Sequence, residues 1–202
     1  WLEDEDYILK SPVRRIHKVK IGTNIKETYS DEALELMRDN CTEPRDLAMI
    51  DMLASTGMRV GEMVLLNIND IDFNERECIV FGKGNKEREV YLNARAHLHL
   101  RQYLESRNDN DPALFVSAKA PHQRLTRAGI RNILSRIGAI AGVENVHPHR
   151  FRRTSATDLL RMGMPIEQVQ ELLGHVKIET TRLYCTVTKE QVRASHRRYM
   201  SA

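Results

Sequence analysis

The segment between Glu77 and Leu92 departs from the helical hydrophobic pattern that governs most of this chain. Two short runs with strand-like composition, 78–81 and 89–92, flank a glycine- and lysine-rich tip from Gly82 to Lys86. A tip of this composition between two such runs is typical of a β-hairpin. The sequence therefore predicts a fold that is mainly α-helical with one small antiparallel β-sheet, an α+β arrangement.

Helical patterns account for most of the remainder. Ser30 is a predicted N-cap, and the segment from about Pro44 to Ser55 is apolar almost all round, which places it in the centre of the core. One further helical stripe is formed by Ile130, Ile133, Leu134, Ile137 and Ala141. Proline and glycine mark two helix starts and one helix end, at Pro148, Pro165 and Gly174.

Composition and charge exclude several classes of protein. A chain of 202 residues, 41% hydrophobic and 29% charged, is expected to form one ordinary globular domain. No apolar run approaches the ~20 residues of a membrane span, so no membrane association is expected. The three cysteines share no C-x-x-C spacing, which favours a reducing, cytoplasmic location without structural zinc. The net charge is only +3, but arginines concentrate between residues 124 and 153, which favours a polyanionic ligand.

The first candidate motif is R-x-x-E, formed by Arg59 and Glu62 after a turn at Gly57. Arginine and glutamate three residues apart lie on one helical face, and the planar guanidinium can hold two phosphate oxygens. An isolated R-x-x-E is more often a structural salt bridge.

The second motif is the lysine-rich hairpin tip, where Lys83 could reach a bound ligand. The tip lacks the phosphate-binding G-x-x-x-x-G-K-[ST] pattern, so nucleotide binding is not expected.

The third motif is H-x-x-R, formed by His149 and Arg152 at a predicted helix start, where the helix itself favours an anion. A metal site made of His147, His149 and His175 is an alternative, but no Asp, Glu or Cys accompanies them at a ligand spacing. The fourth motif is Leu-Gly-His ending at His175, with Tyr184 nine residues later. Singly, a tyrosine or a Gly-His pair has an ordinary packing explanation.

Taken together, the order R-x-x-E, lysine on a hairpin, H-x-x-R, L-G-H and tyrosine resembles the phage integrase, or tyrosine recombinase, family over about residues 30–198. The resemblance implies an enzyme for site-specific DNA recombination or integration, without metal or other cofactor. Its activating residues would be Arg59, Lys83, His149, Arg152 and His175, with Glu62 in support and Tyr184 as the nucleophile. Arg153 departs from the second histidine that many members carry after the arginine, and Cys185-Thr186 departs from the common Thr-His.

The resemblance also assigns roles and partners. Lys83 would be the general acid, His149 a candidate base and His175 a donor to a phosphate oxygen, while the expected DNA contacts are Lys86, Arg88, Arg124, Arg127, Arg131 and Arg150. The three arginines at 124, 127 and 131 are predicted to share one helical face. Double-stranded DNA, a tetramer on DNA (a monomer as a free fragment) and an accessory directionality factor are the expected partners. Residues 1–29 would be a linker from a missing N-terminal core-binding domain, 30–202 the catalytic domain, and about 187–202 its C-terminal tail.

Three other readings stay open. A type IB topoisomerase would use the same tyrosine chemistry without exchanging partners between duplexes. A catalytically silent DNA-binding module would bind DNA without any need for Tyr184. A metal-dependent nuclease would lose its activity in chelator. A phage or mobile-element integrase is the biological role that the short catalytic core favours most.

Overall fold

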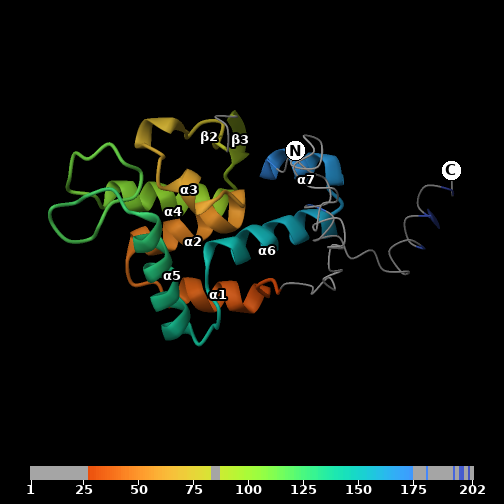
Figure 1. Cartoon of the computed structure of the whole chain (residues 1–202), viewed down its shortest axis with the longest axis horizontal. Helices are drawn as coiled ribbons and strands as arrows, with labels where there is room; N and C mark the ends of the chain where they lie inside the picture. Colours follow the sequence, from red (N-terminus) through yellow and green to blue (C-terminus); the bar gives the residue numbers. More distant parts are fainter. Residues whose placement is uncertain are drawn as a thin grey trace, which may run out of the picture.

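The computed structural model describes residues 27–82, 87–174, 181, 193, 196–197 and 200. Its helices are α1 (Asp31–Asp39), α2 (Pro44–Thr56), α3 (Val60–Met63), α4 (Ala94–Glu105), α5 (Arg127–Ala141), α6 (Pro148–Arg161) and α7 (Ile166–Leu173). Its strands are β1 (Ile71–Asp72), β2 (Glu77–Phe81) and β3 (Glu87–Tyr91), preceded by a 3₁₀ turn at Ile68–Asp70. A mainly helical fold with one small antiparallel sheet confirms the predicted fold class (Figure 1).

Helix α2 lies at the centre of the molecule, where α4, α5, α6 and β3 all pack against it (Figure 1). Met49, Ile50, Met52 and Leu53 are completely buried, as the apolar pattern all round this helix predicted. Burial on every side makes α2 a rigid base for its neighbours. The turn that follows α2 carries Arg59, so the first functional motif is attached directly to this buried helix.

The predicted helix boundaries are largely confirmed. The Ser30 hydroxyl accepts a hydrogen bond from the Ala33 amide at 3.2 Å and caps α1. Pro148 occupies the first turn of α6, and Gly174 ends α7 in the left-handed conformation with φ of 63°. Pro165 is the N-cap of α7 and therefore precedes its first turn.

The sheet has the order β1-β2-β3 with both pairs antiparallel. Cys78 faces Val90 and Val80 faces Arg88, and this side of the hairpin is turned toward the core. The opposite side leaves Ile79 and Phe81 about half exposed. The hairpin confirms the sequence prediction, although its tip at 83–86 lies outside the described residues. Strand β1 was not predicted, because two residues are too short to show an alternating pattern.

Residues just before α1 pack onto α6. Tyr29, which the sequence analysis placed in the linker, is 4% exposed and lies 4.7 Å from the Phe151 ring, centroid to centroid. Its amide donates to the Thr154 hydroxyl at 2.9 Å. The guanidinium of Arg150 covers the Tyr29 ring at 4.3 Å and donates to the carbonyl oxygens of Glu144 and Thr28. Arg150 therefore holds Thr28 and Tyr29, the residues just before α1, against α6.

Arg124 does not share a helical face with Arg127 and Arg131, so the prediction of one common face was wrong. Helix α5 begins only at Arg127, after an N-cap at Thr126, and Arg124 lies in the preceding extended segment. Its guanidinium donates to the carbonyl oxygens of Val64 and Leu66 at 2.9 and 2.8 Å and to the Asn67 side chain at 2.6 Å. These acceptors at the end of α3 turn Arg124 inward, which a helical periodicity argument could not foresee.

Among the described residues, no helix combines the length and apolar character that crossing a membrane requires.

Candidate active site

Arg59 begins the site as the N-cap residue of α3. Its amide donates to Glu62 Oε2 at 2.7 Å and its Nη1 donates to Glu62 Oε1 at 2.8 Å, so backbone and side chain bind the same carboxylate. Its Nη2 donates to the Gly174 carbonyl oxygen at 3.1 Å. The Arg59 side chain is still 37% exposed, whereas the Glu62 side chain is 4% exposed. The predicted pair therefore forms with the guanidinium at the surface and the carboxylate beneath it.

Arg152 extends from α6 to the same place. It is 4% exposed, and its Nη1 donates to the Gly57 carbonyl oxygen at 2.9 Å while its Nη2 donates to the Leu173 carbonyl oxygen. Gly57 ends α2 with φ of 58°, a conformation that costs a side-chain-bearing residue energy. The turn after α2 is thus held from below by Arg152 and continues within two residues to Arg59.

The C-terminal end of α7 joins these arginines. The carbonyl oxygen of Leu172 accepts from Arg88 Nε at 2.9 Å, that of Leu173 from Arg152, and that of Gly174 from Arg59. Carbonyl groups in the last turn of a helix have no intrahelical partners, and the helix dipole makes this end attractive to cations. Three arginines from different parts of the chain therefore converge on three consecutive carbonyl groups.

His149 lies on α6 one turn before Arg152 and is exposed. Burial of part of the ring, followed by the positive charges of Arg152, Arg153, Arg131 and Arg59, lowers the pKa of His149 below its ordinary value. A lower pKa keeps the imidazole neutral at neutral pH, and only a neutral imidazole can accept a proton. The same charges show that His149 lies in a strongly positive environment suited to an anionic ligand.

Two further arginines on α5 border this region. Arg127 is exposed, and its guanidinium packs so closely on Gly61 of α3 that a Cβ there would lie 2.9 Å from Nη2. Arg131, one turn later on α5, is exposed and adds positive potential at His149. Both side chains are exposed and add positive charge near the motif residues.

The remaining predicted residues, Lys83, Lys86, His175 and Tyr184, lie outside the described residues. Their sequence neighbours do reach the site, because Gly174 precedes His175 directly and β2 ends just before the hairpin tip. Within the described ranges no three His, Cys, Asp or Glu side chains are grouped so that they could hold a metal ion.

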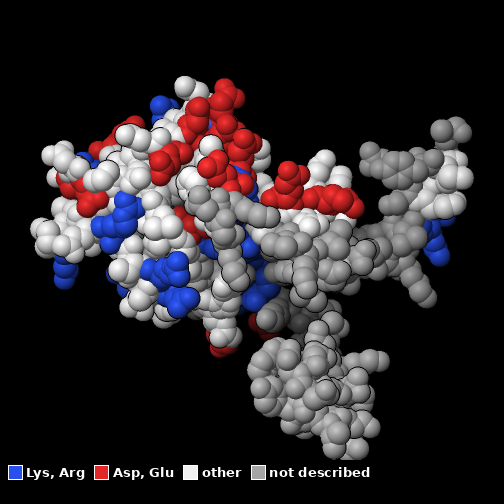
Figure 2. Space-filling view, turned by 45° about the horizontal axis from the view of Figure 1, so that its top comes forward, with Lys and Arg blue, Asp and Glu red and all other residues white. Residues whose placement is uncertain are grey.

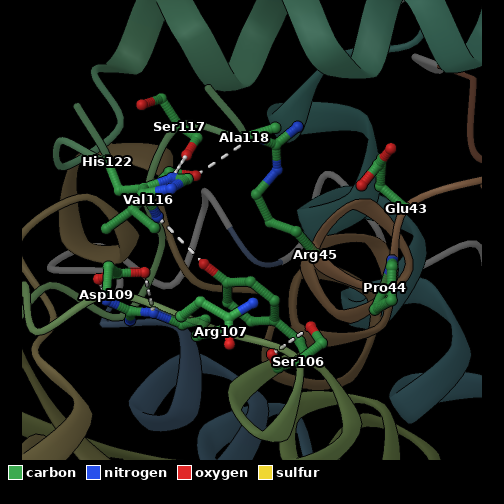
Figure 3. A pocket seen from close by; sticks show the side chains of 12 residues that line it. Glu43, Pro44, Arg45, Ser106, Arg107, Asp109, Val116, Ser117, Ala118 and His122 are labelled. Atoms are coloured by element: carbon green, nitrogen blue, oxygen red, sulfur yellow. Dashed lines mark hydrogen bonds and ion pairs between the residues drawn. The ribbon is translucent and has the colours of Figure 1, made fainter. Parts of the chain in front are cut away.

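A hollow of about 220 Å³ lies between the start of α2 and the end of α4, with walls that include Arg45, Arg107 and His122 (Figure 3). Its polar groups already bind each other: Arg107 pairs with Asp109, and the Val116 amide donates to the Tyr103 hydroxyl at 3.2 Å. None of the 12 described residues around it belongs to the predicted site. The hollow is therefore separate from the arginines that meet at the end of α7, which are Arg59, Arg88 and Arg152.

Residues 24–191 match the profile described as the phage integrase family. This chain belongs to the phage integrase family. Tyrosine recombinase XerC of Corynebacterium glutamicum is 33% identical over 201 residues, which cover 95% of this chain and 65% of that protein. The crystal structure of XerA recombinase, 28% identical, superposes with a TM-score of 0.74 over 91% of this chain and 66% of that one. A pre-cleavage complex of XerH site-specific recombinase with its difH substrate, 25% identical, gives a TM-score of 0.69 over 93% and 58%. The chain thus spans less than two thirds of the length of each of these relatives, between 58% and 66%.

Sequence reasoning for this family member missed two parts of the site. The carbonyl groups of Leu172, Leu173 and Gly174 carry no side-chain signal, so no motif could reveal them. Arg88 was predicted to contact DNA, but its side chain is 9% exposed and pairs with Glu62. A signal was present here: alternation along a strand places Arg88 on the same side as Val90, which faces the core.

Proposed function

We propose that this chain is the catalytic part of a tyrosine recombinase, which cleaves and rejoins DNA at specific sites through a 3′-phosphotyrosyl bond to Tyr184. The observation that carries the proposal is the meeting of Arg59 and Arg152 at the end of α7. These side chains lie 93 positions apart in the sequence, yet both contact the segment that leads directly to His175. Family membership and the recombinase relatives support the same activity.

The chemistry begins with electrostatics, because a phosphodiester is anionic and resists attack. Arg59 presents a partly exposed guanidinium, and the buried Arg152 binds the neighbouring carbonyl oxygen at the end of α7; together they would neutralise the charge that builds on the non-bridging oxygens in the transition state. His175 would donate to one of these oxygens. Removal of one such donor typically costs about 2.7–4 kcal/mol of transition-state stabilisation.

The covalent step needs a nucleophile, a base and an acid. The Tyr184 oxygen attacks phosphorus, the bond to the 5′ oxygen breaks, and the new bond is a 3′-phosphotyrosyl ester. His149, whose lowered pKa keeps it neutral, is suited to take the tyrosine proton, and Lys83 would supply a proton to the leaving 5′ oxygen. Attack by a 5′-hydroxyl of a partner strand reverses these bond changes and reseals the DNA, so no metal or cofactor takes part.

Double-stranded DNA would bind across the face that carries Arg59, Arg127 and Arg131, because neutralised phosphates contribute most of the affinity. Acidic side chains gather in the upper part of the face shown in Figure 2. On strand β3, the side chains of Glu87 and Glu89 are exposed. Negative charge opposes contact with phosphate there. The outer side of the sheet is therefore expected to face away from DNA.

The finer expectations are also part of the proposal: residues 1–29 as a linker from a core-binding domain, a tail from about residue 187, a tetramer on DNA, an accessory directionality factor and a cytoplasmic location. The cytoplasmic location rests on the spacing of the cysteines, and the other expectations rest on the family resemblance. A mobile-element or phage integrase remains the proposed biological role.

A trapping assay tests the chemistry. The full chain is mixed, in chelator, with nicked suicide duplexes drawn from the DNA that flanks its gene. We expect a protein–DNA adduct that survives detergent, disappears in Tyr184→Phe and persists in the control Tyr91→Phe, whose hydroxyl is exposed on β3 and donates to Glu89. Activity that is lost in chelator would indicate a metal nuclease. DNA binding without any adduct would indicate the silent DNA-binding module, and an adduct that relaxes supercoils but never joins two duplexes would indicate the topoisomerase.

A further inference from the structure

Arg88 of β3 is the less exposed of the two arginines that bind Glu62, and its contacts link three separate elements. Its Nε donates to the Leu172 carbonyl oxygen at the end of α7 at 2.9 Å. Its Nη1 and Nη2 donate to Glu62 Oε1 and Oε2 at 3.0 and 2.8 Å, which is a bidentate pair. The side chain is 9% exposed, so these bonds are shielded from water. Arg88 thus connects β3, α3 and α7 beneath the site.

Glu62 divides its carboxylate between two arginines. Oε1 accepts from Nη1 of both Arg59 and Arg88, while Oε2 accepts from the Arg59 amide and from Arg88 Nη2. Two carboxylate oxygens offer about four lone-pair positions, and all four are occupied here. The direction of this carboxylate therefore depends on Arg88 and in turn determines how Arg59 is held.

A second contact between the two arginines runs through Gly174. A Cβ at Gly174 would lie 2.9 Å from Arg88 Cδ and 3.8 Å from Arg59 Nη1. The aliphatic part of Arg88 therefore packs directly against the residue whose carbonyl oxygen accepts from Arg59. The Arg59 guanidinium binds the Glu62 carboxylate and the Gly174 carbonyl oxygen. Arg88 contacts both residues, through hydrogen bonds to Glu62 and through packing against Gly174.

We propose that Arg88 is a positioning residue for DNA cleavage: through Glu62 and the end of α7 it holds the Arg59 guanidinium where it meets the scissile phosphate. This assignment replaces the role as a DNA contact expected from the sequence, and it rests on the proposed recombinase function. Arg88 does not touch the phosphate. Because a displacement of about 1 Å at a reacting group can cost roughly 100-fold in rate, loss of this support lowers cleavage while DNA binding persists.

Electrostatics supports the geometry. Burial works to raise the pKa of Glu62, but the hydrogen bonds from Arg88, followed by those from Arg59, outweigh it and hold the pKa below its ordinary value. Without Arg88, Glu62 stays largely buried, but the strongest interaction that lowers its pKa is lost. The pKa of Glu62 then rises, so protonation at mildly acidic pH would release Arg59 from its carboxylate.

The test measures single-turnover cleavage of a suicide duplex at saturating full chain. Arg88→Met is expected to reduce the rate roughly 10- to 100-fold, with DNA affinity within about threefold of wild type. Arg88→Lys keeps the charge but cannot form the fork, so it is expected to recover only part of this loss. The matched control is Arg107→Met, because Arg107 is also buried (6% exposed) and also binds a carboxylate, Asp109, but lies away from the site. It should melt at a lower temperature and still cleave at the wild-type rate.

Two further readouts separate positioning from a general effect on the fold. In a Glu62→Gln background, Arg88→Met should cost clearly less than it does in the wild type, because the route through that carboxylate is already lost and only the contact with the end of α7 remains. The acidic limb of the cleavage rate should also move to higher pH in Arg88→Met, and not in Arg107→Met. Full cleavage by Arg88→Met, or additive losses in the double variant, would overturn the proposal. If Arg88→Met fails to fold, Arg88→Lys decides in the same way: a wild-type rate and pH profile would overturn the proposal. Absence of an adduct from wild type would refute the recombinase function itself.

Discussion

Two glycines with the same backbone conformation offer a direct measure of how tightly the end of α7 is packed. Gly57 and Gly142 end α2 and α5 with φ of 58° and 68°. A Cβ on Gly57 would lie 2.9 Å from Leu173 Cδ2 and 3.1 Å from Ser155 Oγ, whereas one on Gly142 would meet no described atom within 4 Å. Alanine at either position incurs the left-handed backbone cost, but only Gly57→Ala also forces its neighbours apart.

The expected magnitudes follow from these two contributions. A left-handed alanine costs roughly 1 kcal/mol, so Gly142→Ala should lower the free energy of unfolding by about that amount. Overpacking of a close contact typically adds about 1–3 kcal/mol, so Gly57→Ala should lower it by about 2–4 kcal/mol. Displacement of Leu173 also moves the carbonyl group that binds Arg152, so cleavage should fall in Gly57→Ala only.

The assay is urea unfolding of both variants, followed by circular dichroism, beside single-turnover cleavage under conditions where each variant is folded. The difference between the two variants reports the contact of Gly57 with α7, since the backbone cost is common to both. Equal destabilisation of the two variants would refute the close packing described here. Equal destabilisation with unchanged cleavage in Gly57→Ala would also remove the link between this turn and the active site.

Three other outcomes can be measured. Asp51→Asn should lower the free energy of unfolding by about 1.5–3 kcal/mol, because this buried carboxylate accepts from Arg38 Nε at 2.7 Å and contacts His99 Nδ1 at 2.5 Å; an unchanged urea midpoint would contradict the buried pair. Arg153→Gln removes a positive charge that disfavours the imidazolium, so an NMR titration should show a higher pKa for His149; no change would mean that Arg153 does not act on it. Arg131→Gln should reduce the slope of log affinity for DNA against log salt by about 1, whereas Arg124→Met should leave the slope unchanged and lower stability.

The local features of this chain were predictable from its sequence. The Ser30 cap, the apolar helix at 44–56 and the hairpin depend on residues close together in the chain, where backbone preferences and hydrophobic periodicity act directly. The R-x-x-E and H-x-x-R spacings likewise indicated which residues could act together. Periodicity also predicted that Ile130, Leu134 and Ile137 form the buried side of α5.

Only the tertiary structure decided which arginines serve the ligand and which serve the fold. Arg59, Arg88 and Arg152 contact consecutive carbonyl groups of α7 across separations of 115, 84 and 21 residues, which no local pattern encodes. Arg88 and Arg124 are as basic as Arg131, yet both donate to buried acceptors. The physical reason is that a guanidinium only donates hydrogen bonds, so it binds the acceptor oxygens that the fold places near it. The last carbonyl groups of a helix are such acceptors, because they have no partner within the helix. The sequence determines which groups can donate; packing determines where the acceptors lie.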